Sequence, residues 1–168
     1  SRPLEGANVV LVGTDLGDTA ITIGAGISAA EGSKTSTKAL NDTNGIHVGL
    51  SAVTGDLTVA VGFADGDVAG ISDNGSDEKT GDVVKAGVKY VSGDLTFNVG
   101  LASGDSQDNT IGSSGGSDDS QDVTSASVSY AVASGVTAIL GYTSVEATDE
   151  GAATDDGSAW YIGANMSF

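Results

Sequence analysis

The sequence predicts an all-β fold of antiparallel, up-and-down strands, and three observations support this. Apolar and small polar residues alternate over stretches of about ten residues, which is the pattern of a β-strand. Short turn dipeptides, Gly-Asp or Ser-Gly, recur at Gly17, Gly55, Gly93 and Gly135, with a spacing of roughly 40 residues. No stretch shows the period of about 3.6 residues that an amphipathic helix requires.

The repeat defines the order of the elements. TGDLTVAVGFADGD (54–67) and SGDLTFNVGLASGD (92–105) match at most positions. Each period holds a strand, a long loop rich in Asp, Gly and Ser, a returning strand and a short turn. A β-propeller has a similar period, but its blades hold four short strands and carry signature residues that are absent here. The predicted strands span residues 8–14, 19–30, 45–53, 57–65, 82–91, 95–103, 123–133, 136–146 and 158–168.

Composition excludes several classes of function. The formal net charge is −17, from 6 basic and 23 acidic residues, so a nucleic-acid partner is not expected. The absence of Cys excludes disulfides, Cys-based zinc sites and thiol catalysis. His47 is the only histidine, which excludes a cluster of histidine metal ligands. It would also be the only histidine that could serve as the base of a hydrolytic triad. We therefore expect no enzymatic activity and no cofactor, apart from weak binding of divalent cations by the acidic loops.

The alternation sorts the strands into two faces of different character. One face is apolar and includes Ile21, Ile23, Ala25, Ile27, Val48, Leu50, Leu57, Val59, Val61, Phe63, Val84, Ala86, Val88, Tyr90, Leu95, Phe97, Val99 and Leu101. The other is small and polar and includes Thr22, Gly24, Gly26, His47, Ser51, Thr58, Gly62, Lys85, Lys89, Asn98, Gly100, Ser125, Ser127 and Ser129. Exposed strands of soluble proteins usually carry many charges, whereas here the charges are predicted to lie in the loops.

Placing the apolar face against lipid explains this pattern. Transmembrane β-barrels have strands of about ten alternating residues, with short turns on one side of the membrane and longer loops on the other. No apolar run reaches the length of about 20 residues that a membrane helix requires. Tyr90, Phe97 and Tyr130 lie close to short turns and would form an aromatic girdle at that interface. The prediction is a single β-barrel domain over residues 1–168.

The chain ends in SAWYIGANMSF, in which every second residue from Trp160 is apolar. Trp160, Ile162, Ala164, Met166 and Phe168 resemble the C-terminal assembly signal of Gram-negative outer-membrane proteins, which the barrel-assembly machinery reads. Together with the Gly-Asp hairpins and the acidic loops, the chain resembles the C-terminal part of general porins, particularly those of the Rhodobacter type. The repeats that resemble porins cover most of the chain and are less specific than the terminal signal.

The resemblance implies an outer-membrane location, a homotrimer, contact with outer-membrane lipid and lipopolysaccharide, and passive diffusion of ions and small hydrophilic solutes. His47, Thr58, Lys85, Lys89 and Asn98 are the predicted pore-lining residues. Porins have about sixteen strands, whereas nine are predicted here. Two interpretations follow: the chain is a fragment of a larger barrel, or the first predicted strand is absent and the chain closes with eight.

Two other functions stay open from the sequence. A small closed barrel could act as an anchor or adhesin, although its interior would have to be filled by side chains and the polar face is rich in glycine. A secreted calcium-binding β-protein is the third hypothesis, since stretches such as SDDSQD (117–122) offer oxygen ligands. Neither an EF-hand loop nor a glycine-rich nonapeptide repeat is present.

Overall fold

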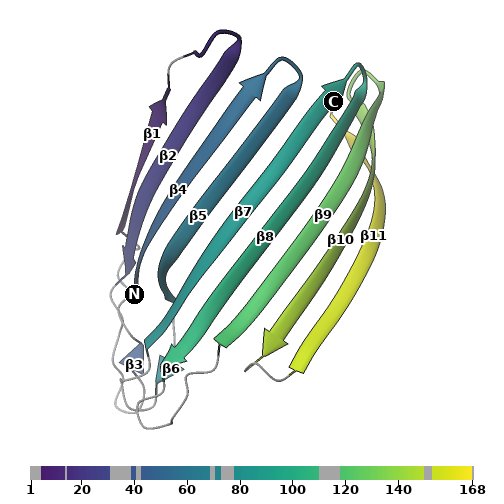
Figure 1. The fold of residues 1–168 in the computed structure, drawn as a ribbon. Helices are drawn as coiled ribbons and strands as arrows, with labels where there is room; N and C mark the ends of the chain where they lie inside the picture. Colours follow the sequence, from purple (N-terminus) through teal and green to yellow (C-terminus); the bar gives the residue numbers. More distant parts are fainter. Residues whose placement is uncertain are drawn as a thin grey trace.

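The computed structural model describes residues 5–13, 15–30, 39–40, 43–68, 71–72, 78–109, 118–149 and 153–167. Within these residues, nine long strands form one antiparallel sheet in which neighbours in sequence are neighbours in space (Figure 1). The strands are β1 (Glu5–Val12), β2 (Thr19–Ala30), β4 (Thr43–Thr54), β5 (Leu57–Val68), β7 (Glu78–Ser92), β8 (Leu95–Asn109), β9 (Asp118–Ala133), β10 (Val136–Asp149) and β11 (Ala153–Met166). The all-β, up-and-down prediction is confirmed.

Four tight turns lie at one end of the sheet. Gly17, Gly55, Gly93 and Gly135 all have positive φ, between 56° and 77°. Glycine reaches this region without the steric cost that a Cβ imposes. Only two residues separate β4 from β5, β7 from β8, and β9 from β10, so these turns fix the register of each hairpin. The repeated turn dipeptide of the sequence is therefore the element that sets the pairing.

The opposite end of the sheet carries the long connections. Two short strands, β3 (Ala39–Leu40) and β6 (Ile71–Ser72), pair with each other there and form a separate small sheet. The sequence placed both segments in loops, because two residues are too few for an alternating pattern to appear.

The strands extend farther toward the long loops than the sequence predicted. β8 continues to Asn109 rather than ending near residue 103, and β9 begins at Asp118 rather than near residue 123. Asp, Gly and Ser have low strand propensity, which hid these extensions. Backbone pairing with the neighbouring strand continues through them. β1 pairs with β2 over eight residues, so the first predicted strand is present and the eight-strand interpretation is wrong.

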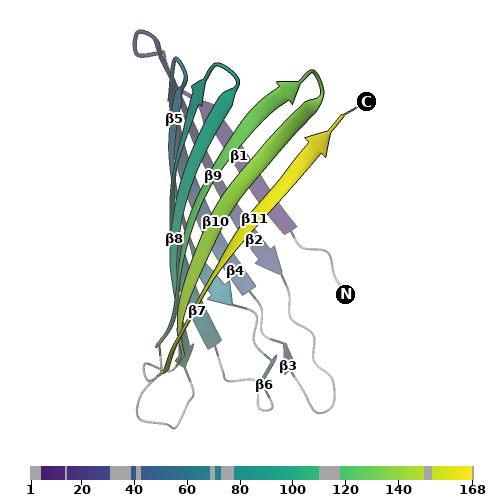
Figure 2. The same ribbon diagram turned by 90° about the vertical axis from the view of Figure 1, so that its right-hand side faces the viewer.

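Among the described residues, none of the large hydrophobic side chains is buried in a core. Two dozen large hydrophobic side chains are instead exposed, and Trp160 and Ile162 reach 72% and 86% exposure. The sheet curls so that β1 and β11 lie on the same side of it (Figure 2). A single sheet without a second layer leaves its apolar face uncovered.

No described residue belongs to a helix that is long and apolar enough to cross a membrane.

Candidate functional site

The register confirms the two predicted faces. Lateral rows of paired residues run across the sheet, and residues of the predicted polar set pair only with residues of the same face, as in Gly24–Gly49–Gly62–Lys85. Gly26 and Gly141 are buried, and both lie on this face. The sheet is curved (Figure 2). Two hollows, of about 740 and 610 Å³, are lined largely by residues of the polar face, among them His47, Gly62 and Lys85, so we assign this face to the inner side of the curve. We call it the concave face, and the apolar side the convex face.

All five predicted pore-lining residues lie on the concave face. Thr58, Lys89 and Asn98 are direct neighbours in one row, because Thr58 pairs with Lys89 and Lys89 pairs with Asn98. The Asn98 side-chain amide donates a hydrogen bond to Ser127 Oγ at 3.3 Å, which continues the row onto β9. The structure therefore brings three of the five residues into a polar row across β5, β7, β8 and β9.

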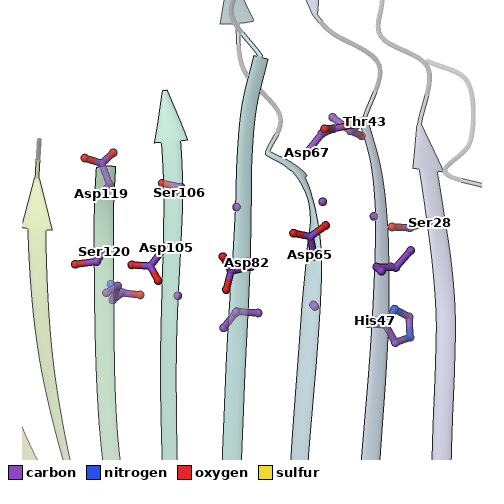
Figure 3. A pocket seen from close by; sticks show the side chains of 18 of the residues that line it. Ser28, Thr43, His47, Asp65, Asp67, Asp82, Asp105, Ser106, Asp119 and Ser120 are labelled. Atoms are coloured by element: carbon purple, nitrogen blue, oxygen red, sulfur yellow. The ribbon is translucent and has the colours of Figure 1, made fainter. Parts of the chain in front are cut away.

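Lys85 and His47 lie nearer the long loops. Lys85 pairs with Gly62 and Ala102, so its side chain has small neighbours on both sides. His47 lies one row farther toward the loops, pairs with Ala64, and lines both large hollows. In Figure 3 it lies on β4 next to Ser28 of β2. His47 and Lys85 are neither in one row nor on adjacent strands.

Sequence reasoning missed one residue of the concave face. Tyr161 on β11 pairs with Gly141 on β10, and its ring occupies the space that a Cβ at Gly141 would need. Gly141 pairs in turn with Ser127, so Tyr161 terminates the polar row that begins at Thr58. A large residue opposite a glycine is a detectable signal, but only after the turn at Gly135 has fixed the register of both strands.

The three interface aromatics lie on the convex face close to the short turns. Tyr90 pairs with Phe97 across the hairpin that turns at Gly93, and Tyr130 pairs with Leu95. Their side chains are 43–47% exposed. Trp160 and Tyr142 form a further aromatic pair on the same face, with ring centroids 4.8 Å apart and planes tilted by 50°. The girdle at the short-turn interface stays a prediction.

Four of the five assembly-signal residues occupy one face of β11. Trp160, Ile162, Ala164 and Met166 alternate along the strand and are exposed on the convex side. Phe168 lies outside the described residues. Recognition of these residues by an assembly machinery stays a prediction.

The apolar band of the convex face runs obliquely across the sheet. Ile21 on β2 and Trp160 on β11 lie in the same lateral row. From this row the band extends toward the long loops on β2, up to Ile27, but toward the short turns on β11, down to Met166. The band is thus displaced by three rows, or six residues, over the seven steps from β2 to β11.

This displacement measures the tilt of the strands against the band. Six residues correspond to about 20 Å along a strand, and seven steps to about 34 Å across the sheet, which gives a tilt of about 30°. The polar boundary moves in the same direction, since Asp65 on β5, Ser103 on β8 and Thr124 on β9 lie in three successive rows. This tilt is close to the roughly 35–45° of strands in membrane barrels. When the strands tilt in this way, the oblique band becomes level and fits a flat layer of lipid.

Acidic residues border the band on the long-loop side, within the strands and not only in the loops as predicted. Asp65, Asp82 and Asp105 are direct lateral neighbours at one height of the sheet (Figure 3). Asp122, Glu146 and Asp156 form a second such row on β9, β10 and β11. In the part of the chain that the structure describes, no group of His, Cys, Asp or Glu side chains is arranged to hold a metal ion.

Comparisons with known proteins identify the fold. No protein-family model matches the chain, and no curated protein matches it. The outer-membrane expressed form of OmpT of Vibrio cholerae superposes with a TM-score of 0.70 at 18% identity, covering 97% of this chain and 56% of that one. The in-vitro folded trimer form of the same protein gives a TM-score of 0.68, with the same identity and coverage. The chain thus spans about half the length of these neighbours.

This likeness corrects the expectation that the chain is not an enzyme. The similarity to OmpT, at 18% identity, concerns the fold alone. One barrel architecture can carry catalytic sites as well as channels, because chemistry depends on the residues grafted onto the fold. The lack of Cys excludes thiol catalysis, and the single His47 excludes a cluster of histidine metal ligands. Neither observation excludes catalysis by other residues. The exclusion of enzymatic activity was therefore wrong as an inference.

The expected location in the outer membrane of a Gram-negative bacterium agrees with these neighbours. The antiparallel meander, the exposed apolar band and the structural likeness lead to one conclusion: the chain has the fold of an outer-membrane β-barrel protein.

Proposed function

We propose that the chain forms part of the wall of a water-filled channel of the general porin type, similar to the Rhodobacter porins, through which ions and small hydrophilic solutes diffuse passively. One observation carries this proposal. Every glycine within strands β2 to β11 lies on the concave face: Gly24, Gly26, Gly45, Gly49, Gly62, Gly66, Gly81, Gly87, Gly100, Gly104, Gly141, Gly157 and Gly163.

A face built this way has little bulk to fill an interior. The positions between the glycines carry mainly Ser, Thr and Ala, so the side chains with most volume point outward. A small barrel needs interior side chains large enough to pack its lumen. The glycines therefore argue against the small plugged barrel of the anchor or adhesin hypothesis and favour an open lumen.

The size of the barrel supports the same proposal. Nine strands correspond to 56% of the length of the structural neighbour, which scales to about sixteen strands for the whole. Barrels of 16–18 strands leave an aqueous channel. The in-vitro folded OmpT of Vibrio cholerae is a trimer form, which supports a homotrimer for this chain as well, with outer-membrane lipid and lipopolysaccharide around it.

Selectivity in such a channel would come from the charges that line it. Lys85 and Lys89 lie on the concave face of β7 and are both exposed. The acidic rows on the strands lie beyond the band on the long-loop side and would give the mouth a negative potential that concentrates cations. We therefore expect a weak cation preference that the two lysines oppose.

The proposal is tested by placing one bulky residue on either face of the same strand. A Cβ built at Gly24 meets no atom within 4 Å, so Gly24→Trp adds an indole to the lumen without a backbone clash. Ile23→Trp is the matched control, since Ile23 lies on the convex face and is 40% exposed. In planar bilayers, we expect the assembled barrel to lose a measurable part of its single-channel conductance with Gly24→Trp only. Equal conductance of both variants would remove the channel proposal.

A further inference from the structure

An apolar hollow of about 520 Å³ lies on the convex face, across the neighbouring strands β8 to β11. Ala126 on β9 has the smallest convex side chain of its lining, so the floor of the hollow lies there. Phe97 and Leu140 line it as well. Tyr142 and Trp160, whose ring centroids are 4.8 Å apart, form the aromatic wall. We call this hollow the β9 groove.

The β9 groove lies within the apolar band that faces lipid. Phe97, Leu140 and Trp160 are exposed rather than covered by another part of the described chain. Apolar groups that border an empty space lose their dispersion contacts, and water offers them no favourable replacement. The occupant that suits this groove is therefore the hydrocarbon chain of a lipid.

A row of hydroxyl groups borders the groove on the long-loop side. Thr124, Ser144 and Ser158 are lateral neighbours there, two residues beyond the row that holds Ala126 and Trp160. Two residues of a strand span about 7 Å, and the headgroup region of one leaflet is about 5–8 Å thick. The hydroxyl row thus lies at the depth of the ester groups of a lipid whose chain fills the groove.

The next row in the same direction is acidic. Asp122, Glu146 and Asp156 are lateral neighbours, and all three side chains are exposed. Neighbouring strands are about 4.8 Å apart, so three negative charges stand close together. They lie about 7 Å beyond the hydroxyl row, which is the depth of the charged groups of the lipid headgroup.

The chain offers these carboxylates no basic partner nearby. The sequence after Lys89 contains eleven acidic residues and no Lys, Arg or His. Lys85 and Lys89 lie on the opposite, concave face. The phosphates of an anionic lipid or of lipopolysaccharide would therefore meet only negative charge here, whereas an ammonium group would be attracted. Charge thus selects among the lipids that could fill the groove.

We infer that the β9 groove binds an acyl chain of a lipid with a primary amine in its headgroup, and that Asp122, Glu146 and Asp156 attract the ammonium group. The other acidic row, Asp65–Asp82–Asp105, is a natural comparison. The row that separates it from the band holds Phe63, Val84 and Ser103, with one hydroxyl group instead of three. The inference depends on the membrane fold and not on conduction.

Trp160 is the only tryptophan of the chain and lines the groove, so its fluorescence reports the lipid bound there. The full chain is reconstituted in mixed vesicles of phosphatidylethanolamine and phosphatidylglycerol, without divalent cations. Bromine atoms on the acyl chains, which quench a nearby indole, are carried by one of the two lipids at a time. The ratio of quenching at equal mole fractions measures the preference of the groove for the amine-bearing lipid.

Three variants test which groups produce the preference. The first replaces the acidic row beside the groove by amides: Asp122→Asn, Glu146→Gln and Asp156→Asn. The matched control makes the same change in net charge in the other row: Asp65→Asn, Asp82→Asn and Asp105→Asn. The third, Ala126→Leu, fills the floor of the groove.

We expect phosphatidylethanolamine to be preferred about five-fold, the factor that one favourable charge contact gives at a membrane surface. The preference should fall to about one in the first variant, persist in the matched control, and decrease in Ala126→Leu. Equal quenching by the two lipids in the unmodified chain would overturn the inference, as would a preference that survives in the first variant or in Ala126→Leu. Preference for phosphatidylglycerol on addition of calcium would instead indicate an anionic lipid bridged by the cation, and would also overturn it. A chain that shows the expected preference but passes no current would remove the channel proposal and leave this inference intact.

Discussion

The two faces of a single strand carry opposite chemistry, and β7 shows this over a short distance. Val84, Ala86 and Val88 lie on the convex face, while Lys85 and Lys89 alternate with them on the concave face. In a soluble sheet the apolar side would be covered by a second layer. Here the apolar side is exposed along an oblique band across the sheet. Gly26 and Gly141, which are buried, lie on the opposite, concave face. An apolar outer face is what a membrane barrel presents to lipid; water on the concave face is part of the channel proposal.

The largest expected effect is the difference in stability between a lysine placed on the convex face and a lysine placed on the concave face. Val59 and Ala60 are neighbours on β5, with Val59 in the middle of the apolar band and Ala60 on the concave face opposite Gly87. Val59→Lys should lower the free energy of unfolding in lipid vesicles by about 2–4 kcal/mol, the cost of a lysine near the bilayer midplane. Ala60→Lys should cost less than about 1 kcal/mol, because its ammonium group stays hydrated. Urea titration in vesicles measures both, and equal losses would contradict the assignment of faces.

The next effect concerns the concave face alone. Gly141→Ala would place a methyl group where the Tyr161 ring lies, so the ring must move, and we expect a loss of about 1–3 kcal/mol. Gly163→Ala is the matched control on the neighbouring strand, since nothing lies within 4 Å of its added Cβ. We expect no loss there. If Gly141→Ala were as stable as Gly163→Ala, Tyr161 would not pack over Gly141 in the assembled barrel.

A smaller effect is expected at the short turns. Gly93 has φ of 59° and open space around its Cβ position, so Gly93→Ala isolates the conformational cost of the left-handed region. That cost is about 1–2 kcal/mol. Gly93→Asn should lose less, because Asn tolerates this region better than Ala. Thermal unfolding in detergent compares the two variants, and the reverse order would show that the turn geometry is wrong.

The smallest predicted effect is on ion selectivity. Replacing Lys85 and Lys89 together by Gln should strengthen cation preference by a few millivolts of reversal potential. The shift should fade with salt, because the Debye length falls from about 30 Å at 0.01 M to about 3 Å at 1 M. Asp82→Asn, on the convex face of the same strand, removes a negative charge instead and should weaken cation preference, by a smaller shift of the opposite sign. An unchanged reversal potential of the double variant at low salt would place the lysines outside the lumen.

Much of this organisation could be predicted from the sequence, because a period of two and a repeated turn are local signals. The alternation located all nine long strands and both faces, including the positions of Thr58, Lys89 and Asn98. The contact of Tyr161 with Gly141 could not be predicted, since it depends on the register between two strands. Some acidic strand ends were also missed. Asp105, Asp122 and Asp156 lie just outside the predicted strand bounds, because their loop-like propensity hides a strand that backbone pairing maintains.

The most direct test is a single-cysteine scan of β7 in lipid bilayers, which is clean because the chain has no native Cys. Spin labels at residues 84 to 90 report collisions with oxygen, which concentrates in lipid, and with a water-soluble nickel complex. We expect a period of two: oxygen access should peak at 84, 86 and 88, and nickel access at 85, 87 and 89. The opposite phase, or access without alternation, would contradict the assignment of the convex face to lipid and the concave face to water.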